Sequence, residues 1–280
     1  MFENIVGHER QKEILTKSIK NDSISHAYLF LGQEGIGKFK FACEFAKKVL
    51  KTENLNNNPD FKIIRKREDK KDIVVEQIRK ELIDDIYIVP ATGERKVYII
   101  DDAHQLNVAA QNTLLKTLEE PPKYITIILV ASNSSSFLTT ILSRVNQIPF
   151  EGITSGVLKN YLIDNFNMTL DDSIVEYVDG SIGKAINIIN NNLIEKYKNI
   201  DELYKYIQNK DIIEAFKHSS NIKFNDEDSL DYLEFVLYKK NKYNCIKIIE
   251  NAKNRLKFNG NYDIIIDSML LRLIDNIEEE

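Results

Sequence analysis

The chain has 280 residues, of which 43% are hydrophobic and 29% are charged, and its 38 Lys and Arg against 43 Asp and Glu give a net charge of -5. This profile excludes disorder, collagen and coiled coil as global descriptions, and the length predicts two or three domains at roughly 100–200 residues each. The acidic balance argues against a protein that coats nucleic acid by itself, because non-specific binding depends on neutralising phosphates with Lys and Arg.

Membrane and secreted classes are also disfavoured. The longest apolar run, Ile125–Ala131, is far shorter than the roughly 18–20 residues that span a bilayer, and residues 1–10 contain no signal-peptide core. We therefore expect a cytoplasmic protein with no membrane partner. The two cysteines, Cys43 and Cys245, lie far apart without a close Cys or His, so neither a zinc site nor a disulfide framework is predicted.

The first half of the chain alternates short β-rich runs with helical periodicity, which is typical of a parallel sheet with crossover helices. Apolar residues recur at helical spacing over Val75–Ile86 and over Ala110–Leu118, and Pro121-Pro122 ends the second helix. The run Tyr98–Ile100 is apolar without alternation, as in a strand covered on both faces. The predicted strands are Ala27–Leu31, Phe61–Ile64, Lys96–Ile100, Ile125–Ala131 and Gln147–Phe150.

After Phe150 only helical patterns remain. Helices are predicted near Thr154–Phe166 and Asp171–Asp179, then a turn at Gly180–Gly183 and a helix through Ile189. From about Leu193 onward, amphipathic patterns predict a helical bundle whose Tyr and Phe side chains form its core. The predicted fold class is α/β plus all-α, with a core over residues 1–150, a small helical unit over 151–192 and a helical bundle over 193–280.

A glycine loop, Gly32-Gln-Glu-Gly-Ile-Gly-Lys-Phe39, separates the first predicted strand from a helix. In this arrangement backbone N–H groups and a helix N-terminus face a phosphate, and Lys38 adds a point charge. A loop that also holds magnesium ends in Ser or Thr, whose hydroxyl is a metal ligand, and that position is Phe39 here. The candidate phosphate-binding residues are Gly32, Gly35, Gly37 and Lys38.

An acidic pair follows the strand Lys96–Ile100. Asp101 is the candidate metal carboxylate and Asp102 the candidate water-orienting one, because a carboxylate at such a strand end holds magnesium near the phosphates. An isolated acidic pair more often caps the following loop, but the glycine loop favours the nucleotide-site interpretation. The basic cluster Lys62–Lys71 is interrupted by two acids and lacks stacking aromatics, so we interpret it as solvated surface rather than a nucleic-acid patch. We interpret His26 and His104 as structural.

With these motifs the chain resembles the bacterial clamp-loader subunits of the AAA+ class. The most specific part is the Leu-Leu-Lys-Thr-Leu-Glu-Glu-Pro-Pro run within Asn112–Pro122, and the resemblance covers roughly the first two thirds of the chain. The other motifs that carry it are Val6-Gly7-His8, Ser25–Phe30, Asn58-Pro59-Asp60, Ile99–His104, Leu142–Val145 and Gly180–Ile186.

The resemblance implies an AAA+ P-loop core, a helical lid and a C-terminal helical collar for the three predicted parts. It implies a hetero-pentamer with gamma or tau and delta subunits, which loads the sliding clamp on primed DNA, and no polymerase activity in the chain itself. A stationary subunit of such a complex gives an arginine in trans to a neighbour's ATP site, and the matching residue is Arg144. A guanidinium suits this role because it is always charged and planar, although a single arginine near a strand end is usually a surface ion-pair partner.

Three positions depart from the pattern of active ATPases in this class. Phe39 replaces the metal-binding hydroxyl, Asp102 stands where Glu is usual, and Gly183, beside Lys184, replaces the second-sensor arginine. These changes remove groups that stabilise charge in the transition state of hydrolysis, rather than groups that bind the nucleotide. We therefore predict a subunit that requires no cofactor and can hold ATP or ADP without efficient hydrolysis. The alternative is an active motor subunit of gamma or tau type. A small P-loop kinase is disfavoured, because such a kinase needs a closing lid with arginines and residues 154–190 contain none.

Two further positions follow from the resemblance. Asn133 stands where the family places its first sensor of the outermost phosphate, and a loop-capping Asn in a Ser-rich turn explains the residue equally well. Many relatives carry a cysteine cluster just before the Asn-Pro-Asp segment, whereas Lys51–Asn58 contains none. No structural zinc, and no other metal, is therefore predicted.

Overall fold

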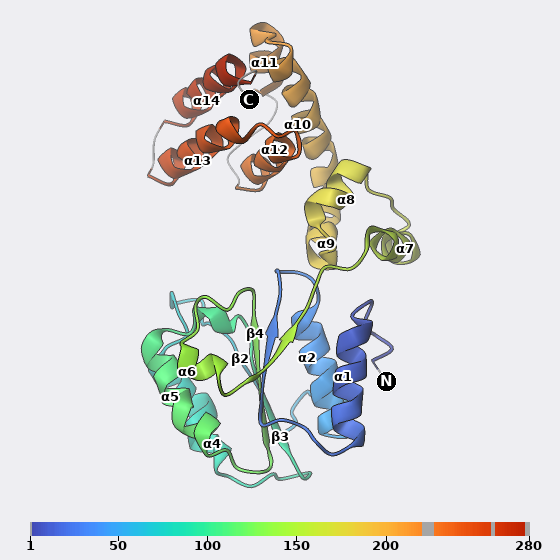
Figure 1. Cartoon of the computed structure of the whole chain (residues 1–280), viewed down its shortest axis with the longest axis vertical. Helices are drawn as coiled ribbons and strands as arrows, with labels where there is room; N and C mark the ends of the chain where they lie inside the picture. The colour runs from blue at the N-terminus through green and yellow to red at the C-terminus, as the bar shows by residue number, and fades with distance from the viewer. Residues whose placement is uncertain (1, 220–226, 259–260, 278–280) are drawn as a thin grey trace. The chain divides into compact units, whose positions relative to one another are not determined.

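The computed structural model describes residues 2–219, 227–258 and 261–277 (Figure 1). The chain divides into two compact units. One comprises residues up to 169 together with 178–184, and the other comprises 170–177 together with the residues from 185 onward. The three-part division at residues 150 and 192 stays a prediction. No helix in the described ranges is long and apolar enough to cross a membrane.

The first unit contains a five-stranded parallel sheet in the order β2-β3-β4-β1-β5. The first four strands have the predicted bounds, whereas the fifth begins and ends one residue earlier than predicted. Phe150 lies just beyond it and still donates its N–H to the carbonyl of Leu31 at 2.6 Å. The strands are β1 (Ala27–Leu31), β2 (Phe61–Ile64), β3 (Lys96–Ile100), β4 (Ile125–Ala131) and β5 (Asn146–Pro149).

Helices cover both faces of this sheet (Figure 1). Tyr28 and Phe30 of β1 pack on one face, and Ala27 and Leu29 pack on the other, as expected for a fully buried parallel strand. The first face is covered by α1 (Glu9–Lys20) and α2 (Lys38–Val49). The second is covered by α3 (Val75–Ile78), the π-helical turn η1 (Arg79–Ile83), α4 (Asp84–Ile86), α5 (Val108–Glu119) and α6 (Thr139–Leu142). The 3-10 turn η2 (Ala103–Gln105) follows β3, and α7 (Ser155–Phe166) follows β5.

The second unit is helical, as predicted, and its core is aromatic. The rings of Tyr197 and Tyr232 stack with centroids 4.3 Å apart, and the Tyr232 hydroxyl donates to Asp201 at 3.0 Å. Tyr238, Tyr243 and Phe258 are exposed, so the prediction of a core role for the aromatic residues was wrong for these three. The helices after α7 are α8 (Asp172–Val178), α9 (Ile182–Asn190), α10 (Leu193–Gln208), α11 (Ile212–Ser219), α12 (Glu227–Lys239), α13 (Tyr243–Lys257) and α14 (Tyr262–Asn276).

A buried carboxylate explains the Asn-Pro-Asp segment before β2. Asp60 is 2% exposed and accepts hydrogen bonds from the N–H groups of Ala91 and Thr92, both at 2.7 Å, and from the Thr92 hydroxyl at 2.6 Å. Burial alone would raise the pKa of Asp60, but the hydrogen bonds from Thr92 and Ala91 outweigh it, so the pKa lies below its ordinary value. The carboxylate therefore joins the start of β2 to the loop before β3.

Asp60→Asn should lower the free energy of unfolding by about 2 kcal/mol at neutral pH, because the amide turns an NH2 group towards backbone donors. A lowered folded-state pKa stabilises the fold above the unfolded pKa of about 3.9, and this stabilisation is lost as the pH falls through the folded-state pKa. The difference between the two proteins should therefore shrink in acid. Urea denaturation across this pH range measures it, with the exposed Asp84→Asn as control. Equal stability of Asp60→Asn and the parent chain at pH 7 would contradict the prediction.

Candidate functional site

Four chain segments meet at the carboxyl edge of the sheet. The glycine loop follows β1, Arg65 follows β2, Asp101 follows β3, and Asn133 lies two residues after β4. These four strands are adjacent in the sheet order. Ligands of open parallel sheets bind in the crevice outside the carboxyl ends of the strands. The fold thus brings the sequence-predicted phosphate and carboxylate residues to one edge, together with an arginine that was not predicted there.

The glycine loop keeps the backbone of an anion site. Gly35 and Gly37 have φ values of +75° and +99°, a conformation that favours glycine. Helix α2 begins at Lys38, so the last two residues of the glycine loop belong to its first turn. In the described part of the chain, the N–H groups of residues 33–40 have no hydrogen-bond acceptor. These groups, at a helix N-terminus, are suited to bind phosphate oxygens.

Lys38 is folded back on the glycine loop. Its Nζ donates to the carbonyls of Gly32 and Gln33, both at 2.6 Å, and its side chain is buried. Burial lowers the pKa of Lys38, whereas the nearby carboxylates Glu34, Asp102 and Asp101 act in the opposite direction. The ammonium therefore stabilises the shape of the loop and faces a negatively charged surrounding.

The carboxylate of Asp101 is paired with Arg65. The Arg65 Nε donates to Asp101 Oδ2 at 3.0 Å, and the guanidinium carbon lies 4.2 Å from the centroid of the Phe39 ring. Burial and the like charge of Asp102 raise the pKa of Asp101, and Arg65 opposes this shift. One guanidinium thus contacts both positions, 39 and 101, at which an ATPase of the AAA+ class would bind magnesium.

These residues do not fit a magnesium ion. Phe39 offers no oxygen ligand, one Asp101 oxygen accepts from Arg65, and the other accepts from the Asp102 N–H at 3.2 Å. Magnesium requires near-ideal octahedral coordination by oxygen atoms. The site therefore differs from a metal-dependent ATP site at both positions, 39 and 101, that would supply a protein ligand to the metal.

Two other predicted residues have local partners. The Ser135 hydroxyl donates to Asn133 Oδ1 at 2.8 Å, which is a loop-capping contact, and the sensor role of Asn133 stays a prediction. Asp102 is exposed beside Glu34 and His104, and one ligand atom of each residue lies within 4.8 Å of the others. His104, interpreted from the sequence as structural, thus lies with Glu34 and Asp102 in one group that no sequence motif indicated.

The turn Gly180–Gly183 packs against the glycine loop. The Gly183 N–H donates to the Gly35 carbonyl at 2.8 Å, and the Ser181 hydroxyl donates to the Glu34 carbonyl at 2.9 Å. A Cβ atom at Gly183 would lie 2.7 Å from Gly35 Cα and 3.0 Å from its carbonyl oxygen. Position 183 therefore has no room for any side chain in this conformation, including the arginine of motor subunits.

Arg144 lies after α6, and its contacts are with its own neighbourhood. Its Nη2 is 2.9 Å from Glu119 Oε1, and its Nη1 donates to the Thr140 carbonyl at 2.9 Å. Glu119 is the last residue of α5, within the specific Leu-Glu-Glu-Pro-Pro run. About a third of the arginine side chain is exposed, at 34%. None of its hydrogen bonds in the described ranges involves the glycine loop.

Gln111 holds the segment that leads to Arg144. It is buried, and its Nε2 donates to the carbonyls of Leu106 and Ser136 at 3.0 and 2.8 Å. Its Oε1 accepts the Leu138 N–H, directly before α6, at 2.8 Å. A glutamine on the buried face of a predicted helix is the signal that could have identified this positioning residue.

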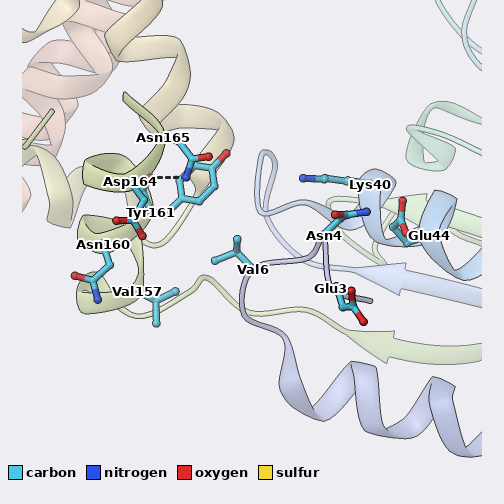
Figure 2. Close-up of a pocket in the computed structure, with 10 residues that line it drawn as sticks. All are labelled: Glu3, Asn4, Val6, Lys40, Glu44, Val157, Asn160, Tyr161, Asp164 and Asn165. Atoms are coloured by element: carbon cyan, nitrogen blue, oxygen red, sulfur yellow. Dashed lines mark hydrogen bonds between the residues drawn. The ribbon is translucent and has the colours of Figure 1, made fainter. Parts of the chain in front are cut away.

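A cavity of about 640 Å³ lies beside the first turns of α2 (Figure 2). Figure 2 shows Tyr161 and Asn160 of α7 on one side and Lys40 of α2 with Asn4 on the other. Lys40 stands two residues after Lys38 on the same helix. The cavity therefore adjoins the first turns of α2, the helix that follows the glycines of the loop.

Comparisons with known proteins find DNA polymerase III subunits among the relatives of this chain. DNA polymerase III subunit tau of Bacillus subtilis is 31% identical over 212 residues, which are 67% of this chain and 37% of that protein. Subunit tau/gamma of Haemophilus influenzae is 29% identical over 207 residues, 67% of this chain and 30% of that protein. The chain thus spans about a third of the length of these curated relatives.

A solved structure shares the fold of this chain. The crystal structure of a DNA polymerase III gamma-subunit-related protein from Thermotoga maritima aligns with a TM-score of 0.54 and 15% identity, over 94% of this chain and 99% of that chain. The predicted fold class, a parallel α/β core followed by helices, is confirmed. A family model described as "DNA polymerase III, delta subunit" matches residues 7–154, which span the entire sheet, the glycine loop and Arg144. Because this match covers more than half of the chain, the protein belongs to that DNA polymerase III clamp-loader family.

Proposed function

We propose that this chain is the non-motor, delta-prime-type subunit of a DNA polymerase III clamp loader. In this role it joins gamma or tau and delta subunits in a hetero-pentamer that places the sliding clamp on primed DNA. It supplies Arg144 to the ATP site of a neighbouring subunit and does not hydrolyse ATP efficiently itself. The observation that carries the proposal is the guanidinium of Arg65 held between Phe39 and Asp101.

The contacts of Arg65 bear on hydrolysis because phosphoryl transfer depends on charge neutralisation. In P-loop ATPases the loop hydroxyl and the strand-end carboxylate hold the metal that neutralises the β and γ phosphates. Here one position is an aromatic ring and the other is ion-paired. The tight contact of Gly183 with Gly35 further excludes a second-sensor arginine. The chain's own site thus lacks several of the groups that stabilise the transition state.

Arg144 is suited to act outside this chain. The Gln111 hydrogen bonds fix the backbone before α6, and Glu119 orients the guanidinium at the surface. A partly exposed ion pair of this kind contributes only about 0–1 kcal/mol, so a phosphate of a neighbour can replace Glu119 at little cost. Arginine side chains are always charged in proteins, which suits contact with a phosphate.

The second candidate function is an active motor subunit of gamma or tau type. It is favoured by the intact glycines, by Lys38 and by the unpartnered N–H groups of the glycine loop in the described chain. The curated relatives named above are themselves tau and tau/gamma subunits. The two candidates differ in whether the isolated chain hydrolyses ATP. They also differ in the place of the chain in the complex, either beside gamma or tau subunits or as one of them.

Co-purification tests the proposed role. The full chain carries a tag and is co-expressed with the gamma or tau and delta subunits of its own organism. The molar masses of the complexes are measured by light scattering after gel filtration. We expect one hetero-oligomer that contains this chain and that loads a labelled clamp on primed DNA. If gamma or tau and delta load the clamp equally fast without this chain, and the chain elutes alone, the proposed role is wrong.

A further inference from the structure

We propose that Arg65 takes the place of the divalent cation, so that the chain binds the phosphates of a nucleoside di- or triphosphate without magnesium. This inference rests on the proposed function, in which the glycine loop is a nucleotide site that does not hydrolyse its ligand. It concerns the chemistry of binding at that site and is tested separately.

The sheet itself sets the position of Arg65. Ile64, the last residue of β2, pairs with Ile100, the last residue of β3, so Arg65 and Asp101 leave adjacent strand ends. The Asp101 N–H donates to the Ile64 carbonyl at 2.9 Å. On the other side, the buried side chain of Gln77 donates to the Arg65 carbonyl at 2.7 Å. The backbone of Arg65 is therefore held by the sheet and by α3 rather than by a free loop.

The guanidinium is oriented by one hydrogen bond and one ring. Its Nε donates to Asp101, and its central carbon lies over the Phe39 ring, 4.2 Å from the ring centroid. Arginine has further N–H donors on its two terminal nitrogens. In the described part of the chain these have no acceptor, and 55% of the side chain is exposed. A fixed fork of unused donors matches phosphate oxygens well.

These donors lie next to the glycine loop. Phe39, which contacts the guanidinium, directly follows Lys38 in the first turn of α2. The unpartnered N–H groups of residues 33–40 belong to the same turn and loop. A polyphosphate on this loop would therefore meet backbone donors, the Lys38 ammonium and the Arg65 guanidinium together. A magnesium ion at Asp101 would instead meet a like charge at ion-pair distance, which opposes its binding.

Nucleotide titration of the full chain tests this inference. Binding of ADP and of ATP is measured by calorimetry in excess magnesium and in EDTA. For the parent chain we expect dissociation constants that agree within about threefold between the two conditions. Arg65→Ala should weaken binding in EDTA about tenfold or more, because a charge-assisted contact is lost. The matched control is Arg67→Ala, an exposed arginine that pairs with Glu81 at 2.7 Å, and it should bind as the parent chain does.

Three results would overturn the inference. These are parent-chain binding that is lost in EDTA, Arg65→Ala binding that is unchanged in EDTA, and no binding of either nucleotide in both conditions. Magnesium-dependent binding that disappears in Asp102→Asn would place the cation at Glu34, Asp102 and His104 instead. Each of these results leaves the non-motor role standing, since that role is decided by assembly and by the neighbour's ATP turnover.

Three further variants test the inference, and the first of them guards against misfolding of Arg65→Ala. If Arg65→Ala fails to fold by circular dichroism, Arg65→Lys keeps the charge and loses the planar fork, and we expect a smaller but measurable loss in EDTA.

Nucleotide binding by Phe39→Thr alone should stay independent of magnesium, because Arg65 is still paired with Asp101. The double variant Phe39→Thr with Arg65→Ala should become magnesium-dependent. Magnesium dependence in Phe39→Thr alone would show that Arg65 does not replace the cation.

Discussion

In Arg144→Ala, ATP hydrolysis at the neighbouring subunit's site is expected to be about a thousandfold slower, while the chain stays folded and assembled. The expected loss is large because the guanidinium stabilises charge that develops only in the transition state. The fold is expected to persist because the ion pair of Arg144 with Glu119 is partly exposed and contributes little to stability. Quenched-flow measurement of ATP hydrolysis by the reconstituted loader, with primed DNA and clamp present, should show the loss of the fast phase from that site.

Controls separate the role of Arg144 from a general effect of removing an arginine. Arg67→Ala, in the same unit, removes an exposed ion pair with Glu81 and should leave the fast phase intact. Arg144→Lys keeps a charge without the fork of donors, and an intermediate rate is expected. An unchanged fast phase in an assembled complex that carries Arg144→Ala would remove this residue from the site.

Gly183→Arg, which introduces the arginine of motor subunits, is expected to destabilise the first unit by about 3 kcal/mol. Its Cβ would lie 2.7 Å from Gly35 Cα, so the turn must separate from the glycine loop, and the hydrogen bond between Gly183 and Gly35 is lost with it. Overpacking costs about 1–3 kcal/mol and a lost hydrogen bond about 0.5–1.5 kcal/mol. Urea denaturation measures the change in the free energy of unfolding.

The matched control for Gly183→Arg is Lys184→Arg, which adds a guanidinium one residue further along the chain. It should change stability by less than about 0.5 kcal/mol, as is usual for substitutions at exposed positions. Gly183→Ala should shift stability in the same direction as Gly183→Arg, since the Cβ atom alone makes the close contact. A Gly183→Arg protein as stable as the parent chain would show that the turn moves freely from the glycine loop.

Much of the sheet could be predicted from the sequence because its strands are buried on both faces. Apolar runs such as Ile125–Ala131, interrupted only by Thr126, have few alternatives to a central parallel strand, and the observed bounds of β4 agree with the prediction. Pro121-Pro122 likewise predicts the end of α5, which is observed at Glu119. The strand β5 has polar and exposed positions, Asn146 and Gln147, so its start carried a weaker signal.

The partners of the site residues could not be predicted, because they depend on packing between distant segments. Arg65 belongs to a basic cluster that was interpreted as solvated surface, and Arg65 is exposed as that interpretation expects. Its pairing with Asp101 could not be predicted, because it depends on the β2–β3 register. The pairing of Glu119 with Arg144 joins the end of α5 to the residue beyond α6. Only the three-dimensional contact shows that Gly183 touches Gly35.

Single-turnover hydrolysis of γ-labelled ATP by the isolated full chain, with excess magnesium, tests the central claim most directly. The guanidinium of Arg65 contacts Phe39 and Asp101, the two positions that would bind magnesium in an active ATPase. We therefore predict no phosphate release above the uncatalysed background. Rapid release that is abolished by Lys38→Ala would show hydrolysis in the chain's own site and would contradict the non-motor account.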